Sequence, residues 1–463
     1  MKTRRPKSWR PAYLLLGACS SCYLLFFIWY DCGVSVQVVP SFSRGSRVGT
    51  GLRPPQTRFD TLRLTTEQCE ATFPGLTKDL NDTVSLGPFN IQPSGDGGPL
   101  QVKIEDGQLF IFQPNRTDAL SPELLDAQTA TLHQLHRAII TSPAPLPDTI
   151  ITVNVNDQPF GSAFSYTRPA FRPAPSGSHG PPLTRAFLMP HFSFWTWPLP
   201  SIGSVSRVAA ALSAMESQVP FRSKDHRLAW RGTMGWNSPH YPGLRENLLR
   251  VTEQAKWADV QALHGYGLEA PHNTNASEEF NSMRSNALMI EDFCRYKYVL
   301  YTEGITYSGR LQFLQMCRSV LVSPPIAWLQ HSTHLIKPLF SSDILILPEP
   351  KGWQPYEGVD EAWPVHYPPE EANAVFVSPD WSDLERIVAW LEENPGVAEG
   401  IAERQRELFV GKGYLSPAAE VCYWRALIRG WSEAGEYESH DWGDRETVSW
   451  ELFSLGHDSG KSR

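Results

Sequence analysis

The stretch Tyr298–Val322, YVLYTEGITYSGRLQFLQMCRSVLV, carries the signals of an α/β unit. Its first residues (298–301) and its last (319–322) are short and mostly apolar, which predicts two buried strands. The segment 308–317 between them has the apolar period of a helix. A strand, a helix and a second strand in this order indicate two parallel strands joined by a crossover.

The loop between the first strand and the helix contains the residues that suggest a ligand. Glu303 and Gly304 form a turn, and the helix is expected to open at Ser308, Gly309 and Arg310. Backbone N–H groups at a helix start favour a phosphate, and a glycine lets it approach closely. Arg310 would add a bidentate, charge-assisted contact. The alternative is an ordinary strand–helix loop with Arg310 on the surface.

The rest of the chain alternates in the same way. Further strands are predicted at 148–155 and 259–264. Predicted helices cover residues 124–140, 242–256, 287–296, 381–393, 397–409 and 417–431. This alternation predicts an α/β fold with parallel sheets.

Two further segments place polar residues at the ends of strands. Residues 228–233, LAWRGT, predict a strand that ends in Arg231 and Gly232, which would clamp a diphosphate. Asp157 follows the strand at 148–155, where α/β folds place reactive groups, so it is a candidate general base. The alternatives are a common Arg-Gly turn and an aspartate that caps a turn before Pro159.

The amino terminus predicts a membrane anchor. Five basic side chains lie within the first ten residues, and Ala12–Tyr30 has no charged side chain. At about 1.5 Å per residue, this segment nearly spans the roughly 30 Å hydrocarbon core of a bilayer. Because basic residues stay cytosolic, residues 1–11 are expected in the cytosol and the body in the lumen of the Golgi or the endoplasmic reticulum. A cleaved signal peptide is the alternative, but this apolar run is longer and its exit is bulky.

The regions on either side of the body are expected to be extended. Residues 31–61 predict a stem, and residues 432–463 predict an acidic tail that stays in solvent. The formal net charge is −8 and the body has no basic run, which argues against a nucleic-acid partner. In the lumen, the sequon residues Asn81, Asn115 and Asn275 would be usable acceptors for N-linked glycans.

Four of the seven cysteines lie in the body, and oxidation is expected in the lumen. They are Cys69, Cys294, Cys317 and Cys422, and four cysteines allow three pairings. The body has no CxxC pair with histidine partners, so no structural zinc or other metal site is expected.

Several segments together resemble glycosyltransferase family 90, which includes fungal capsule-associated xylosyltransferases and animal protein O-glucosyltransferases. They are LPDTIITVNVNDQP, MPHFSFWTWP, LAWRGT, FCRYKYVLYTEGITYSGRLQFLQMCRSVLV, DWSDLERIVAWL and VCYWRALI. The resemblance runs from about residue 147 to 431 and is closer to the fungal branch. It implies a GT-B fold, in which two Rossmann-like lobes enclose a nucleotide-sugar cleft and the final helices cross back. We therefore expect the first lobe at 62–220, the second at 221–395 and the crossing helices at 396–431.

The same resemblance implies an inverting transfer from a UDP-sugar that needs no metal or other cofactor. Asp157 would deprotonate the acceptor hydroxyl. Arg231 and Arg310 would hold the diphosphate and stabilise the leaving UDP. Ser308 and Gly309 would add hydroxyl and backbone contacts.

The fungal branch favours xylose as the transferred sugar, with glucose next, and a glycan or glycoconjugate as the acceptor. Trp195 and Trp197 would wall the sugar or acceptor pocket, and packing inside the lobe is the alternative. His191, in the same segment, stands where we expect an aspartate in many fungal relatives. Glu303 stands where the animal branch has an arginine, and it would contact the ribose hydroxyls.

The resemblance also sorts the cysteines and marks one insertion. Cys294 is expected to pair with Cys317, and Cys422 with Cys69. Residues 341–371 form a longer, acidic and proline-rich connection than in the animal branch, either a substrate-specific flap or an ornament.

Two other functions compete with this reading. A catalytically silent luminal protein could bind a nucleotide or glycan on the same fold, but the intact Asp157, Arg231 and Arg310 argue against it. A metal-dependent transferase of the GT-A type would need an Asp-x-Asp motif after a strand, and the body has no convincing one.

Overall fold

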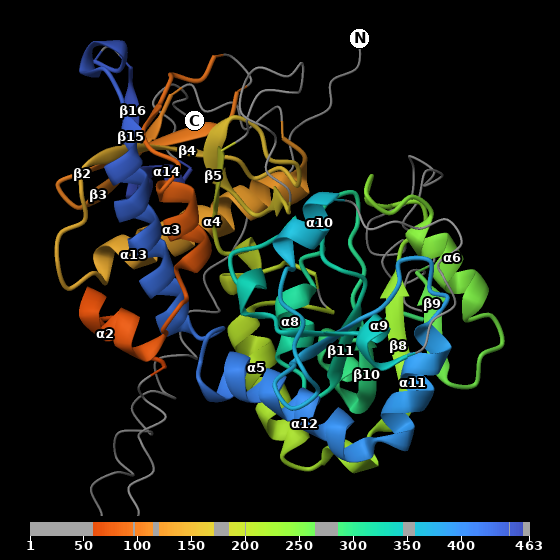
Figure 1. Cartoon of the computed structure of the whole chain (residues 1–463). Coiled ribbons are helices and arrows are strands. Elements are labelled where there is room, and N and C mark those ends of the chain that lie inside the picture. Colours follow the sequence, from red (N-terminus) through yellow and green to blue (C-terminus); the bar gives the residue numbers. More distant parts are fainter. Residues whose placement is uncertain are drawn as a thin grey trace, which may run out of the picture. The chain divides into compact units, whose positions relative to one another are not determined.

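The computed structural model describes residues 59–95, 98–113, 120–170, 185–199, 201–263, 286–345, 357–443 and 445–456 (Figure 1). The predicted anchor at 12–30, most of the predicted stem, and the sequon residues Asn115 and Asn275 lie outside these ranges. Within them, none of the helices has the length and apolar character needed to cross a bilayer. Asn81 is exposed on helix α3 (Lys78–Val84).

Six parallel strands form one sheet, in the order β13-β14-β11-β10-β8-β9. The strands predicted at 259–264, 298–301 and 319–322 are confirmed as β9, β10 and β11 of this sheet. The bounds are β8 (Asp225–Gly232), β9 (Ala258–Ala262), β10 (Tyr296–Leu300), β11 (Val320–Ser323), β13 (Pro338–Phe340) and β14 (Ala374–Phe376). The chain continues from β8 to β9 toward one edge of the sheet and from β10 to β11 toward the other edge. The order of successive strands therefore reverses between the neighbours β8 and β10.

A second six-stranded sheet is mixed, which differs from the expectation of parallel sheets throughout. Its order is β16-β3-β2-β4-β5-β7, and β4–β5 and β5–β7 are its parallel pairs of neighbours, whereas the other neighbouring pairs are antiparallel. The bounds are β2 (Leu100–Glu105), β3 (Gln108–Phe112), β4 (Thr149–Val153), β5 (Ser162–Ser165), β7 (Arg185–Leu188) and β16 (Thr447–Ser449). The tight turn at Asp106–Gly107 joins β2 to β3 as an antiparallel hairpin, which needs no crossover helix.

The helices around the sheets agree with the sequence in position but not always in length. Helix α4 (Pro122–Ile140) begins as predicted, because the Ser121 hydroxyl accepts the Leu124 N–H and Pro122 occupies the first turn. The other long helices are α5 (Val205–Glu216), α11 (Leu384–Glu393), α12 (Pro395–Arg406) and α13 (Pro417–Ala434). The helices predicted at 242–256 and 308–317 shorten to α6 (Leu244–Val251) and α8 (Leu311–Gln315). The segment 287–296 forms only a 3-10 turn, η6 (Ile290–Arg295), because β10 starts directly after it.

Helix α13 returns from the parallel sheet to the mixed sheet, where it packs beside α3 and α4 (Figure 1). Both disulfides predicted from the resemblance are confirmed, Cys294–Cys317 and Cys69–Cys422, and the second ties α13 to α2 (Thr66–Thr72). Buried Arg425 of α13 donates to the carbonyl oxygens of residues 62, 64 and 138 and to the Thr141 hydroxyl. This one guanidinium therefore joins the start of the described body to α4 and α13.

The acidic segment 432–463 does not remain in solvent over the residues that the structure describes, so that prediction is wrong. Strand β15 (Gly435–Glu436) pairs with β1 (Phe89–Asn90), and β16 forms the edge of the mixed sheet. Trp442 and Trp450 are buried. Burial of the two indole rings removes a large apolar surface from water. The acidic side chains nearby can stay exposed and hydrated, so the segment folds back despite its charge.

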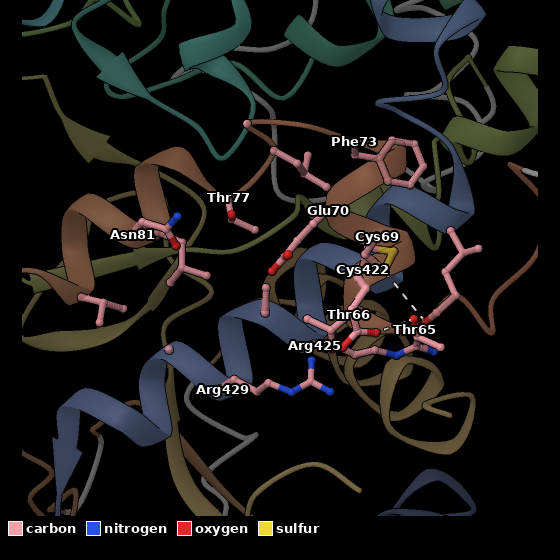
Figure 2. Close-up of a pocket in the computed structure, with 18 of the residues that line it drawn as sticks. Thr65, Thr66, Cys69, Glu70, Phe73, Thr77, Asn81, Cys422, Arg425 and Arg429 are labelled. Atoms are coloured by element: carbon pink, nitrogen blue, oxygen red, sulfur yellow. Dashed lines mark hydrogen bonds between the residues drawn. A yellow bond between two sulfur atoms is a disulfide. The ribbon is translucent and has the colours of Figure 1, made fainter. Parts of the chain in front are cut away.

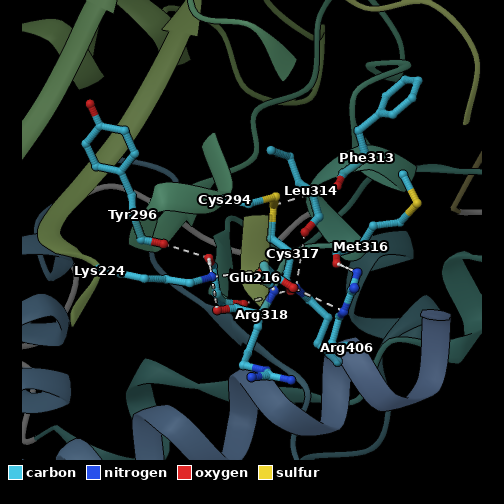
Figure 3. Close-up of a disulfide and its surroundings, with 12 residues drawn as sticks. Glu216, Lys224, Cys294, Tyr296, Phe313, Leu314, Met316, Cys317, Arg318 and Arg406 are labelled. Carbon is cyan, nitrogen blue, oxygen red and sulfur yellow. Dashed lines mark hydrogen bonds and ion pairs between the residues drawn. A yellow bond between two sulfur atoms is a disulfide. The ribbon is translucent and has the colours of Figure 1, made fainter. Parts of the chain in front are cut away.

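A buried charge network fastens the amino ends of β8 and β11 to the helices below them (Figure 3). The Lys224 ammonium group is fully buried and donates to the Glu216 carboxylate at 2.9 Å and to the Arg318 carbonyl oxygen at 2.6 Å. The other Glu216 oxygen lies 3.1 Å from Nε of Arg406 on α12. The network lies at the end of the sheet opposite to the predicted site, so its role is structural.

We expect Lys224→Met to lower the free energy of unfolding by about 3–5 kcal/mol, because it leaves the buried carboxylate with less compensation. The measurement is urea unfolding of the full chain. Arg222→Met is the matched control, since Arg222 pairs with Glu399 in solvent and such pairs contribute about 1 kcal/mol or less. Equal shifts in the two variants would contradict a structural role for the buried network.

Candidate active site

Asp157 lies in the loop after β4, as predicted, and the loop is held by Asn154. The Asn154 side chain is buried, donates to the Gln158 carbonyl oxygen at 2.8 Å and accepts the Asn156 N–H at 3.0 Å. Asp157 has an exposed surface. Even so, the surrounding protein partly desolvates its carboxyl group, which raises the pKa of that group above the ordinary value. A carboxylate with a raised pKa at the end of a strand suits a general base.

The loop of Asp157 touches the loop that follows β10. The Thr306 hydroxyl donates to the Asp157 carbonyl oxygen at 3.1 Å. Tyr307, the next residue, is buried, and its pKa is raised first by that burial and then by the charge of Asp157. The structure therefore brings the predicted base, on the mixed sheet, to the loop of the parallel sheet that carries Arg310.

The side chain of Arg231 is committed to the protein, which argues against its predicted place at a diphosphate. It is buried at the end of β8, with Nη2 2.9 Å from the Asp259 carboxylate. Nε donates to the Asn286 carbonyl oxygen at 2.8 Å, and Nη1 donates to the carbonyl oxygens of Trp230 and Asp259. Four of its five N–H groups are used, so binding a phosphate would break an existing pair.

Arg245 and Arg310 are two cations whose charges interact at the reversal of strand order between β8 and β10. Arg245 donates to the carbonyl oxygens of Glu303 (3.1 Å) and Thr233 (2.8 Å), and Arg310 donates to the carbonyl oxygen of Arg231. Within the described ranges neither guanidinium forms an ion pair. Burial, followed by repulsion from Arg310, lowers the pKa of Arg245 to about 9, and burial lowers that of Arg310 to about 10. Two partly desolvated cations without a carboxylate form a site for an anion.

Arg245 is the site residue that the sequence analysis missed. It is the second residue of α6, which begins directly after Gly243, and the φ of +70° at Gly243 turns the chain from the β8 loop into the helix. The signal was present, since α6 was expected to follow β8. A second strand–helix loop next to that of Arg310 would also end at the reversal point.

The side chains packed against residue 309, rather than an open phosphate site, explain why this residue is a glycine. A Cβ atom built on it would lie 2.6 Å from Nε2 of His191 and 2.9 Å from Cζ3 of Trp197. The rings of His191, Tyr166 and Tyr307 surround the same place, with centroids 5.4–6.2 Å apart. His191 and Trp197 therefore do lie at the loop of Arg310, as the prediction of a shared pocket requires.

The imidazole of His191 is held in one protonation state. Its Nδ1 accepts the backbone N–H of Ser193 at 3.2 Å and lies 3.2 Å from the Gln312 amide nitrogen. Burial lowers the pKa of His191 to about 3, so the ring is neutral. Because Nδ1 is an acceptor, the proton resides on Nε2, which faces Gly309.

Trp195 does not join this group. Its ring stacks on His133 at 4.4 Å, and the Arg137 guanidinium lies 5.2 Å from its centroid. Both partners belong to α4, so Trp195 covers that helix instead of walling a pocket with Trp197. Neighbouring sequence did not reveal this, because Trp195 closes the 3-10 turn η3 (Phe192–Phe194) and its ring contacts depend on α4, which lies far away in the sequence.

The Glu303 carboxylate binds the backbone at the start of a strand, so only part of it could contact a ribose. One oxygen accepts the N–H groups of Ala327 (2.9 Å) and Trp328 (2.7 Å), and the other oxygen is buried with no partner within the described ranges. Trp328 begins β12 (Trp328–Leu329), which pairs with β6 (Arg168–Pro169) of the other half of the molecule. Burial raises the pKa of Glu303 to about 8.

The remaining predicted donor-site residues shape the loops. The ring of Trp230 covers Gly232, where a Cβ atom would meet it at 2.3 Å. Gly304 lies beside Nη2 of Arg245, and the Ser308 N–H donates to the Tyr301 hydroxyl at 3.0 Å. Of these three residues, Gly304 is the one that lies against a guanidinium group of the pair Arg245 and Arg310.

A hollow of about 730 Å³ lies elsewhere, between α2, α3 and α13 (Figure 2). The disulfide Cys69–Cys422, Glu70, Arg429 and the sequon residue Asn81 line it. The predicted base and donor residues are not among its lining residues, so its volume does not mark the candidate active site.

Comparison with known proteins supports the assignment of this site to a family. A model of glycosyl transferase family 90 matches residues 97–341, which is more than half of the chain. The chain is 22% identical over 302 residues to O-glucosyltransferase rumi of Drosophila melanogaster, covering 64% of this chain and 62% of that protein. It is 23% identical over 299 residues to protein O-glucosyltransferase 1 of Homo sapiens, covering 63% and 64%. The chain thus spans less than two thirds of the length of these relatives.

We expect Glu303→Gln to make the fold less sensitive to pH. A carboxyl group whose pKa rises from 4.5 to about 8 on folding stabilises the fold fully below pH 4.5, and this stabilisation is lost as the pH rises toward 8. The free energy of unfolding of the variant should therefore gain on that of the wild type between pH 5 and pH 8. Denaturant unfolding at both values measures it, with exposed Glu385→Gln as the control. An equal difference at both pH values would refute the burial argument.

Proposed function

The chain belongs to glycosyl transferase family 90, and we propose that it transfers a sugar from a UDP-sugar to a hydroxyl group with inversion at the anomeric carbon. The observation that carries this proposal is the meeting of Asp157 with the loop of Arg310, beside Arg245. A direct displacement of a diphosphate requires a base and an anion site that lie close together in space.

The proposed reaction is a single displacement. Asp157 takes the proton of the acceptor hydroxyl as its oxygen forms a bond to the anomeric carbon. The bond between that carbon and the β-phosphate oxygen breaks, and UDP leaves with the electron pair. Attack from the side opposite to an α-linked UDP gives a β-linked product. A raised pKa makes Asp157 a stronger base than an ordinary carboxylate once it is deprotonated.

Arg245 and Arg310 would stabilise the charge that develops on the leaving diphosphate. Their guanidinium groups are already positioned by backbone carbonyl oxygens, so little reorganisation is needed when UDP departs. This pair supplies the positive charge that a metal ion supplies in other transferases, and we propose that the reaction needs no metal. Arg231 would act indirectly, by holding the end of β8 through Asp259.

The donor sugar is proposed as xylose or glucose. The resemblance to the fungal branch favours xylose, whereas the relatives are named for the transfer of glucose. One hydroxymethyl group distinguishes the two sugars, so the walls near His191 and Trp197 would decide between them. The name of the human relative also points to a protein as an acceptor, next to the glycan or glycoconjugate expected from the sequence.

We extend the proposal to the GT-B fold and to the secretory pathway. Two sheets, one of them parallel with a reversal of direction at the site, and the return of α13 support the GT-B architecture. The two disulfides support an oxidising compartment such as the lumen of the Golgi or the endoplasmic reticulum. The proposed type II anchor is the apolar segment 12–30.

A panel of UDP-sugars tests the function. We expect the purified full chain to hydrolyse UDP-xylose or UDP-glucose slowly and to do so equally well with EDTA present. UDP release is the readout. Loss of activity in EDTA would overturn the metal-free reaction, and UDP binding without turnover of any sugar would favour a silent binding protein.

Asp157→Asn is the control for the panel. The amide keeps the size of the side chain but cannot take a proton, so transfer should fall by at least about 100-fold. UDP affinity, measured by calorimetry, should stay within about twofold. Normal turnover in this variant would show that another group is the base.

Arg245→Met and Arg231→Met separate the two arginines. Loss of a charge-assisted contact of roughly 1.5–3 kcal/mol predicts at least about tenfold weaker UDP binding for Arg245→Met. Arg231→Met should instead lower the unfolding temperature, because the Asp259 carboxylate loses one of its cationic partners, while the folded fraction keeps its UDP affinity. Calorimetry and thermal unfolding measure both effects. Equal losses of UDP affinity in the two variants would show that Arg231 contacts the diphosphate as well.

A further inference from the structure

The hollow between α2, α3 and α13 has a glycosylation sequon in its wall (Figure 2). Asn81, the first residue of the triplet Asn81-Asp82-Thr83, is exposed and lines the hollow. Its side-chain amide forms no hydrogen bond within the ranges that the structure describes. An N-linked glycan would attach to the nitrogen of this amide, so no existing contact has to break.

The size and the lining of the hollow suit sugar rings. Its volume of about 730 Å³ lies in the range of sites for small ligands. Buried apolar side chains form part of the lining, and they are Leu64, Phe73, Leu76 and Leu80. The exposed residues Thr66 and Glu70 and the half-buried Arg429 add polar groups. Arg429 has no hydrogen bond or ion pair with the part of the chain that the structure describes. A sugar ring has apolar C–H faces and hydroxyl groups at its edges, so it can contact both kinds of lining.

The sequon is closed in the folded protein but open while the chain is being made. The Thr83 hydroxyl, which is part of the recognised triplet, is buried and donates to the Asp79 carbonyl oxygen at 2.9 Å. Helix α13 packs against α3, and a Cβ atom built on Gly430 would lie 2.9 Å from Cγ2 of Val84. Because α13 is made long after α3, the sequon has no cover during most of synthesis. A glycan can therefore be added before the hollow forms around it.

We propose, resting on the secretory location put forward with the proposed function, that Asn81 carries an N-linked glycan whose first sugars lie in this hollow and cover the disulfide Cys69–Cys422. The Asn81 amide nitrogen forms a bond to the anomeric carbon of an oligosaccharide, while the bond from that carbon to the diphosphate of a lipid-linked donor breaks. The diphosphate leaves with the electron pair, and the nitrogen loses one proton. Both cysteines line the same hollow, so a glycan seated there limits the access of a thiol to their sulfur atoms.

The full chain produced in a eukaryotic host tests the attachment and the position of the glycan separately. Mass spectrometry should find a glycan on Asn81. Under native conditions, a small thiol should reduce Cys69–Cys422 at least about threefold faster in Asn81→Gln than in the wild type, because the disulfide loses its cover. Alkylation of the released cysteines measures the rate, and Asn81→Ser is a second variant should the first not fold. Cys294–Cys317, whose two cysteines are fully buried, should stay oxidised and is the internal control.

Ser85→Gln is the matched control. Ser85 is exposed, lines the hollow and follows Asn81 by about one helical turn, so the variant places a glutamine on the same wall and leaves the sequon intact. It should keep both the glycan and the slow reduction. An unmodified Asn81 in a body that sealed vesicles protect from protease would overturn the proposal. Reduction of Cys69–Cys422 at equal rates in the wild type and Asn81→Gln, or in the two glutamine variants, would also overturn it. A body that protease digests outside sealed vesicles would refute the luminal location instead.

Discussion

The reversal of strand order between β8 and β10 is the constraint on which the site depends. These strands are neighbours in a parallel sheet, and the chain leaves their carboxyl ends toward opposite sides. Their two loops therefore diverge, and the side chains at the start of α6 and just before α8 come close enough for their charges to interact. Arg245 and Arg310 occupy these two positions, and the Asp157 loop reaches them from the mixed sheet through Thr306.

The pair of arginines has an energetic cost that the donor would offset. Each guanidinium is partly desolvated, and the charge of Arg310 lowers the pKa of Arg245 further. A dianionic diphosphate would remove that repulsion, so ligand binding and fold stability are coupled at this point. Backbone carbonyl oxygens accept hydrogen bonds from both groups and hold them in place in the absence of an anion.

Local patterns in the sequence predicted the strands of the parallel sheet well, because short apolar runs between turns leave few alternatives. The end of β4 was enough to locate Asp157, and the family resemblance paired the cysteines correctly. Patterns could not reveal that Arg231 meets Asp259, since the pairing of β8 with β9 depends on the whole sheet. Arg245 was missed for the converse reason: its neighbours predicted a helix, and nothing local showed that this helix starts beside another strand's loop. The burial of Trp442 and Trp450 in an acidic segment likewise depends on the pairing of β16 with β3, a strand far away in sequence.

The distribution of strands along the chain also implies an order of folding during synthesis. All strands of the parallel sheet lie between residues 225 and 376, so this sheet can assemble from one continuous stretch. The mixed sheet begins earlier in the chain but needs β16 at its edge, α13 as a cover and Cys422 as the partner of Cys69. Until those last segments leave the ribosome, the apolar strands of the amino-terminal half remain without their cover. The half whose synthesis begins first is therefore completed after the parallel sheet, and its disulfide closes only once Cys422 has been made.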